Sequence, residues 1–181
     1  MIKHFQGLMV FLFGILFLVV QDVAAATATP DTEMQFSGTL VSEPCTIAPD
    51  DTEITLDFAE IIDKYLYINT RTHSLPFIIH LQDCDVTGAE TVITHFEGAQ
   101  STELPGYLTM GNATIGAAIG IEEKDGSFLG LNKDSKPVQL VDGSTALTFQ
   151  AFVEGEPTAL KNQTITLGEF SSTATFFLEY P

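Results

Sequence analysis

Apolar and polar residues alternate along several short stretches of the chain, and Gly, Pro, Asp and Asn separate these stretches. The clearest alternation runs through 77–82, 147–154 and 173–180. Side chains of a strand point to opposite faces with a period of two, so each stretch has one face suited to a core. Weaker strands are expected at 34–41, 53–58, 90–97 and 113–122, and residues 61–67 fit a helical turn.

These elements predict an all-β chain. About seven short strands, almost nothing at helical spacing and no internal repeat or linker favour a single β-sandwich. The chain has no Trp. It therefore lacks the tryptophan that packs on the core disulfide of antibody domains.

The start of the chain has a different pattern. Lys3 and His4 precede an uncharged run, 5–21, that is rich in Leu, Phe and Val, and Ala24 and Ala25 follow it. A basic start, a short apolar core and small residues at the exit predict a secretory signal peptide at 1–25. The apolar core is too short to span a bilayer comfortably, and no later stretch is a candidate. We therefore expect an exported chain without membrane insertion.

Charge narrows the choice of partners. The chain has 24 acidic residues against 7 Lys and Arg, a formal net charge of −17. Such a surface repels phosphate backbones and anionic lipid headgroups, which excludes nucleic acid as a ligand class. An enzyme, a binding module and a structural subunit all remain open at this point.

An exported chain meets an oxidising compartment, where Cys45 and Cys84 are expected to form a disulfide. The bond would close a loop of about 40 residues and stabilise the fold by roughly 4 kcal/mol in the chain-entropy model. Cys84 shares the parity of Ile78 and His80, which are expected to point outward. The bond is therefore expected to pin strand ends and not to cross the core.

No pattern supports catalysis or metal binding. A glycosidase needs two carboxylates that face each other across a cleft, one of them with a raised pKa. The chain has two acidic pairs, Asp83 with Asp85 and Glu122 with Glu123. Acids so close in sequence do not meet that need, and they are interpreted as solvated turn residues. The histidines lack the short spacing of a zinc site, and the chain has no Gly-x-Ser-x-Gly. We expect no catalytic residue, no metal and no cofactor, with a secreted hydrolase as the rival hypothesis.

Both ends of the exported part are unusual. The last alternating run ends at Tyr180 and Pro181. From Phe170 to the end of the sequence, Glu179 is the only charged residue. An apolar edge strand pairs readily with other chains, so we expect a partner to cover it. Ahead of Cys45 lies the tail 27–36, whose alternation suits a strand lent to a neighbour. A frayed terminus is the alternative for that tail, but the two ends together favour strand exchange.

These residues resemble the pilins, the subunits of chaperone–usher pili. Phe36-Ser37-Gly38 leads into the first strand, and Cys45 follows about seven residues later. Leu81-Gln82-Asp83-Cys84 closes the strand that holds the second cysteine, and Ala174-Thr175-Phe176 runs to a penultimate Tyr180. The passage 104–108, Leu-Pro-Gly-Tyr-Leu, resembles the minor, adaptor-type subunits of P pili. The resemblance covers essentially all of the exported part.

The resemblance implies an incomplete immunoglobulin-like sandwich that lacks its final strand, with a pilin domain at 37–181 and a donor-strand extension at 26–36. A periplasmic chaperone would fill the gap first, and at the outer-membrane usher the extension of a neighbouring subunit would replace it. The implied chaperone and groove residues are Ala174, Phe176, Leu178, Tyr180 and the Pro181 carboxylate. The implied donor residues are Ala28, Pro30, Thr32, Met34 and Phe36.

Two positions of the tail depart from the pilin pattern. Thr32 stands where pilin extensions usually carry Gly, and Pro30 removes a backbone donor, so the register of the donor strand stays open. The resemblance implies a structural pilus subunit, a minor one that contributes to cell adhesion and is transported through the periplasm to the cell surface. Whether it is a rod, adaptor, tip or terminator subunit stays open. The alternative function is a single-domain carbohydrate-binding adhesin, for which Tyr65, Tyr67 and Tyr107 are the loop candidates.

Overall fold

The computed structural model describes residues 37, 43–111 and 115–181. The expected signal peptide and donor-strand extension lie outside the described residues, and so does the expected strand at 34–41 except for Ser37. All described residues other than Ser37 belong to one compact unit, Val41–Pro181. Among them, no helix has both the length and the apolar character needed to cross a membrane.

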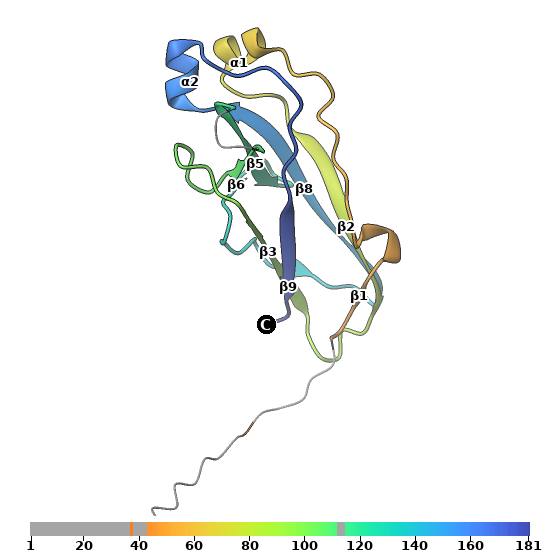
Figure 1. The fold of residues 1–181 in the computed structure, drawn as a ribbon. Coiled ribbons are helices and arrows are strands. Elements are labelled where there is room, and N and C mark those ends of the chain that lie inside the picture. Colours follow the sequence, from red (N-terminus) through yellow and green to blue (C-terminus); the bar gives the residue numbers. More distant parts are fainter. Residues whose placement is uncertain (1–36, 38–42, 112–114) are drawn as a thin grey trace, which may run out of the picture. The chain divides into compact units, whose positions relative to one another are not determined.

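The described residues form nine strands and three short helices, which confirms the all-β prediction (Figure 1). In chain order these elements are β1 (Thr46–Ile47), η1 (Pro49–Asp51), α1 (Asp63–Asn69), β2 (Leu75–Cys84), β3 (Thr91–Gly98), β4 (Leu108–Thr109), β5 (Ala117–Glu123), β6 (Phe128–Leu129), β7 (Val138–Gln139), β8 (Gly143–Gly155), α2 (Pro157–Asn162) and β9 (Ala174–Glu179). The helical turn expected at 61–67 is α1. The strand expected at 53–58 is wrong, because no strand forms there.

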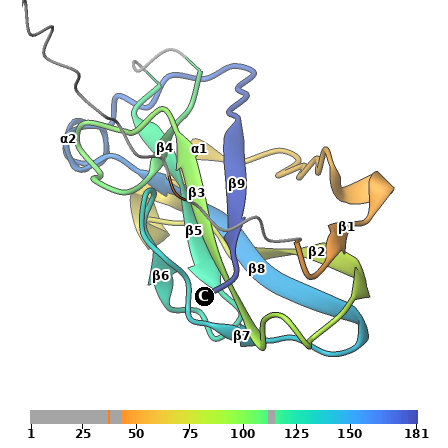
Figure 2. The same cartoon turned by 90° about the horizontal axis from the view of Figure 1, so that it is seen from below.

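The strands make two sheets (Figures 1 and 2). The first has the order β1-β2-β8-β5-β4, with β6 also paired to β5, and the second has the order β7-β3-β9. Every pairing is antiparallel. β9, the last strand in the chain, pairs with β3 alone among the described strands.

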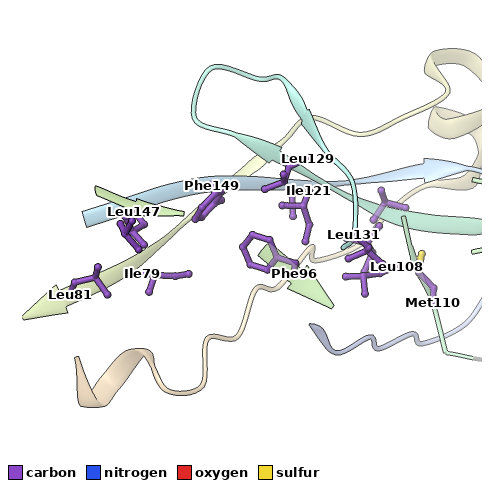
Figure 3. Close-up of a cluster of buried hydrophobic side chains, with 14 of the residues drawn as sticks. Ile79, Leu81, Phe96, Leu108, Met110, Ile121, Leu129, Leu131, Leu147 and Phe149 are labelled. Atoms are coloured by element: carbon purple, nitrogen blue, oxygen red, sulfur yellow. The ribbon is translucent and has the colours of Figure 1, made fainter. Parts of the chain in front are cut away.

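The core lies between the two sheets (Figure 3). β2 contributes Ile79 and Leu81, and β8 contributes Leu147, all fully buried. Phe96 of β3 packs against Phe149 of β8 with the rings edge to face at 5.1 Å. The period-two prediction for these strands is therefore confirmed, because alternate residues face the opposing sheet.

A bulge near the end of β2 changes the position of the second cysteine. The pairing with β8 shifts register between Gln82 and Cys84, and Asp83 takes a φ of 51°. An extra residue in one strand reverses the alternation after it, so Cys84 turns inward and is only 6% exposed. The expected outward parity of Cys84 is therefore wrong. The predicted disulfide with Cys45 is present, and it joins the flank of β1 to the end of its neighbour β2.

Candidate functional site

The outer edge of β9 has no partner among the described residues. Its inner side chains, Ala174, Phe176 and Leu178, are only half-buried although they pack on the core, and Tyr180 continues this face. The alternate residues Thr175, Phe177 and Glu179 are exposed. β9 is thus an edge strand whose apolar face is not sealed.

A second unpaired segment, residues 52–60, follows η1. Ile54, Leu56 and Phe58 alternate with exposed residues and are half-buried against the core. The segment makes no backbone ladder; within it, the Ala59 N–H donates to Asp57 Oδ1 at 2.8 Å. Ala59 has a φ of 52°, which breaks an extended strand. The alternation of a strand is present here without the hydrogen bonds of one.

Contacts of residues outside the two segments mark both ends of β9: Phe170, which precedes β9, packs near Phe58, and Glu43, which precedes η1, lies near Tyr180. Near the start of β9, the rings of Phe58 and Phe170 lie 6.4 Å apart. Near its end, burial raises the pKa of Tyr180, and the nearby Glu43 carboxylate raises it further. We call residues 52–60 the first rim, β9 with Tyr180 the second rim, and the half-buried apolar surface between them the open seam.

The floor of the open seam is aromatic. Phe77 of β2 is half-buried, and its ring lies 6.0 Å from Phe96 and 5.8 Å from Phe149. Beyond Phe58, a cavity of about 60 Å³ opens between Ile61, Leu66 and Phe170. This recess is lined mainly by apolar side chains, and its residue Phe170 lies beside Phe58 of the first rim.

A polar clip fixes the point where the chain leaves the first sheet for the seam. The Asp51 carboxylate accepts hydrogen bonds from the His80 backbone N–H at 2.5 Å and from His80 Nδ1 at 2.7 Å. The backbone hydrogen bond, followed by the His80 side chain, lowers the pKa of Asp51 in spite of an opposing contribution from burial. The clip holds η1 on β2, so the first rim begins at a defined place.

One expectation about the acidic residues is wrong. Glu122 is 5% exposed, and its carboxylate accepts hydrogen bonds from Arg71 Nη1 at 2.7 Å and from Ser74 Oγ at 2.6 Å. Burial by itself would raise the pKa of Glu122, but the hydrogen bonds from Arg71 and Ser74 lower it, and the net shift is downward. The guanidinium of Arg71 also lies 3.5 Å above the ring of Phe152.

This network lies on the opposite face of the first sheet from the core, where sequence alternation predicted polar residues. Phe152 is 1% exposed there because Arg71 covers it and Tyr107 packs edge-on at 5.8 Å. Both covering residues are distant in the chain, and Arg71 lies 81 residues before Phe152. No local signal in the sequence indicates such a partner.

The other candidate residues make intramolecular contacts. Tyr65 hydrogen-bonds His73, the Tyr67 hydroxyl accepts from the Ile165 N–H, and Tyr107 donates to Glu154. Asp83 and Asp85 are exposed, as expected. Across residues 43–111 and 115–181, no group of three His, Cys, Asp or Glu side chains is arranged to hold a metal ion.

The fold and the open seam define a β-sandwich with a missing edge strand. A family model described as "Fimbrial protein" matches residues 34–181, so the chain belongs to the fimbrial protein family. It is 31% identical to the putative minor fimbrial subunit PmfF of Proteus mirabilis (91% of this chain, 93% of that protein). It is 29% identical to the fimbrial adapter PapK of Escherichia coli (82% and 87%).

Comparison with a solved structure supports the same family and fold. The P pilus rod subunit PapA superposes with a TM-score of 0.68 at 25% identity, covering 77% of this chain and all of that one. The predicted resemblance to pilins and the immunoglobulin-like pilin fold are thereby confirmed. Members of this family are structural subunits and not enzymes, so the chain is a fimbrial subunit without catalytic activity.

Proposed function

We propose that this chain is a subunit of a chaperone–usher pilus that is completed by donor-strand exchange. The open seam carries the proposal. Two segments, residues 52–60 and β9, each carry half-buried apolar side chains that pack on the core, and no described strand pairs with the outer edge of β9. An inserted strand would pair with β9 and cover this surface, which is β-augmentation.

The residues divide into an acceptor and a donor. Ala174, Phe176, Leu178 and Tyr180 would contact the periplasmic chaperone first and the donor strand of a neighbouring pilin afterwards, and the Pro181 carboxylate would meet basic chaperone residues. On the donor side, Ala28, Pro30, Thr32, Met34 and Phe36 would enter the seam of the next subunit. The outer-membrane usher would be the place of exchange.

Apolar burial supplies the driving force in this proposal. Covering four or five medium side chains contributes on the order of 5 to 10 kcal/mol before ordering costs. Exchange then needs no covalent step and no nucleotide. The backbone ladder with β9 adds registry and slow release.

A minor position in the pilus and a contribution to adhesion are the finer parts of the proposal. Relatives named a minor subunit and an adapter support the minor position, although a rod subunit shares the fold. Export would proceed through the periplasm to the surface fimbrium. The carbohydrate-binding alternative gains no support, because the hydroxyls of all three candidate tyrosines bind within the chain.

Expression in a periplasm tests the proposal. The chain alone is expected to be degraded or to aggregate, because the seam is open. Coexpression with its chaperone, or fusion of residues 27–36 after Pro181 through a flexible linker, is expected to give a soluble monomer. A matched control fusion carries Met34→Asp and Phe36→Asp in the added tail and is expected to remain unstable. Stable monomer from the unfused chain without a chaperone would refute the proposal.

A further inference from the structure

Both rims of the open seam carry only negative charge. The first rim has Glu53, Asp57 and Glu60, and the second has Glu179, while neither contains Lys, Arg or His. All four carboxylates belong to exposed residues. None of them forms an ion pair within the described residues. Any strand that fills the seam is therefore flanked by uncompensated acidic side chains.

The position of these charges determines which donor residues they affect. A strand inserted between the rims points alternate side chains into the seam and the others to solvent, whichever direction it runs. On adjacent strands, same-face neighbours lie about 4.5 to 8 Å apart. Glu53, Asp57 and Glu179 point away from the core, so they flank the outward residues of the donor and not its inward ones.

The tail of this chain carries the same charge on that face. With Ala28, Pro30, Thr32, Met34 and Phe36 inward, the outward residues include Asp31 and Glu33. In the seam of a second copy, these carboxylates would lie beside acidic rims with no base between them. Like charges placed opposite each other on neighbouring strands destabilise the pairing.

We propose that the acidic rims select a donor strand from a different polypeptide, one whose outward side chains are basic or uncharged, and disfavour a second copy of this chain. This inference rests on the proposed function, since it assumes that a strand fills the seam. The inward residues provide affinity, and the outward charges discriminate between donors.

Peptide exchange tests the inference. The exported chain is refolded with one of three labelled peptides: residues 27–36, the same peptide with Asp31→Asn and Glu33→Gln, or with Asp31→Lys and Glu33→Lys. Dissociation is followed by fluorescence anisotropy in excess unlabelled peptide at 20 mM and 1 M NaCl. A fourth peptide with Met34→Asp and Phe36→Asp controls for binding in the seam.

At low salt the native peptide is expected to dissociate fastest and the lysine peptide slowest. Each outward position contributes roughly two- to five-fold, so about four- to twenty-five-fold separates the two peptides. The difference should collapse at 1 M salt, where the screening length is about 3 Å. Replacing the rim residues by Glu53→Lys and Glu179→Lys leaves Asp57 and Glu60 opposite two lysines, so the rims carry no net charge and the difference between the peptides should largely disappear.

The outcomes separate the two proposals. If the three intact peptides dissociate at the same rate at low salt while the aspartate control fails to bind, the charge preference is wrong and the seam proposal stands. If the order of the peptide dissociation rates is unchanged by the rim substitutions, the preference for a basic donor does not come from these carboxylates. If no intact peptide binds, both proposals fall.

Discussion

The substitution Arg71→Ala tests the buried ion pair on the outer face of the first sheet. Glu122 is nearly sealed, with 7% of its side chain exposed, while 37% of the Arg71 side chain is exposed. Removing one partner of a fully buried pair costs about 3 to 5 kcal/mol because the other charge is left buried. Because water reaches the guanidinium, the loss of unfolding free energy should be smaller than for a fully buried pair. Losing the contact between Arg71 and the ring of Phe152 increases that loss. We expect about 2 to 3 kcal/mol at pH 7.

The pH dependence follows from the sign of the shift. The pKa of Glu122 is lowered in the folded protein, so the contribution of the pair is complete above the ordinary pKa of 4.5 and is lost as pH falls through the folded pKa. In Arg71→Ala the buried carboxylate can take up a proton at pH 4. The destabilisation by the substitution should therefore be smaller at pH 4 than at pH 7.

Urea unfolding of the donor-fused monomer, followed by far-ultraviolet circular dichroism, measures both effects. Glu122→Gln is the matched control, because the amide oxygen can still accept from Arg71, and it should cost about 1 kcal/mol. A cost for Arg71→Ala below about 0.5 kcal/mol at pH 7, or an equal cost at both pH values, would contradict the reasoning.

Three further predictions concern the fold and the seam. A methyl group at Gly120 would lie 2.3 Å from an aromatic ring atom, so Gly120→Ala should destabilise the donor-fused monomer by about 1 to 3 kcal/mol in urea unfolding; an unchanged midpoint would contradict this close contact. Replacing Cys45 and Cys84 by Ser should cost roughly 4 kcal/mol, and reductant should then have no further effect. Phe176→Ser, on the seam face of β9, should abolish chaperone-dependent accumulation in the periplasm, whereas Phe177→Ser, 42% exposed on the other face, should preserve it; equal loss on immunoblots would count against the seam.

Strand alternation was sufficient to predict most of the core. Ile79, Leu81 and Leu147 have the parity that the sequence indicated, and all three are fully buried. The apolar face of β9 was predicted in the same way. Such predictions succeed because one face of a strand must be apolar wherever a core covers it, whatever the partner strand is.

The wrong predictions for Cys84 and for residues 53–58 have the same cause. Cys84 faces inward because a bulge at Asp83 shifts the register, and the alternation of a single strand contains no sign of that shift. Residues 53–58 alternate like a strand but pair with none of the strands in the described part of the chain. Hydrogen-bond pairing depends on which chain segments meet, and local sequence does not encode it. α2 was missed for a different, local reason: Glu154 to Pro157 has the residues of a turn, whereas Pro157 begins a helix.

By itself, the sequence determined the all-β class, the disulfide partners, the apolar face of the last strand and the family resemblance, because these follow from residue types and short-range periodicity. Only the tertiary structure decided that residues 52–60 form no strand, that Glu122 is buried beside Arg71, and that Glu53, Asp57, Glu60 and Glu179 are exposed without an ion pair among the described residues. These features join residues far apart in the chain. Their free energies depend on distance and burial in three dimensions, which no pattern along the sequence specifies.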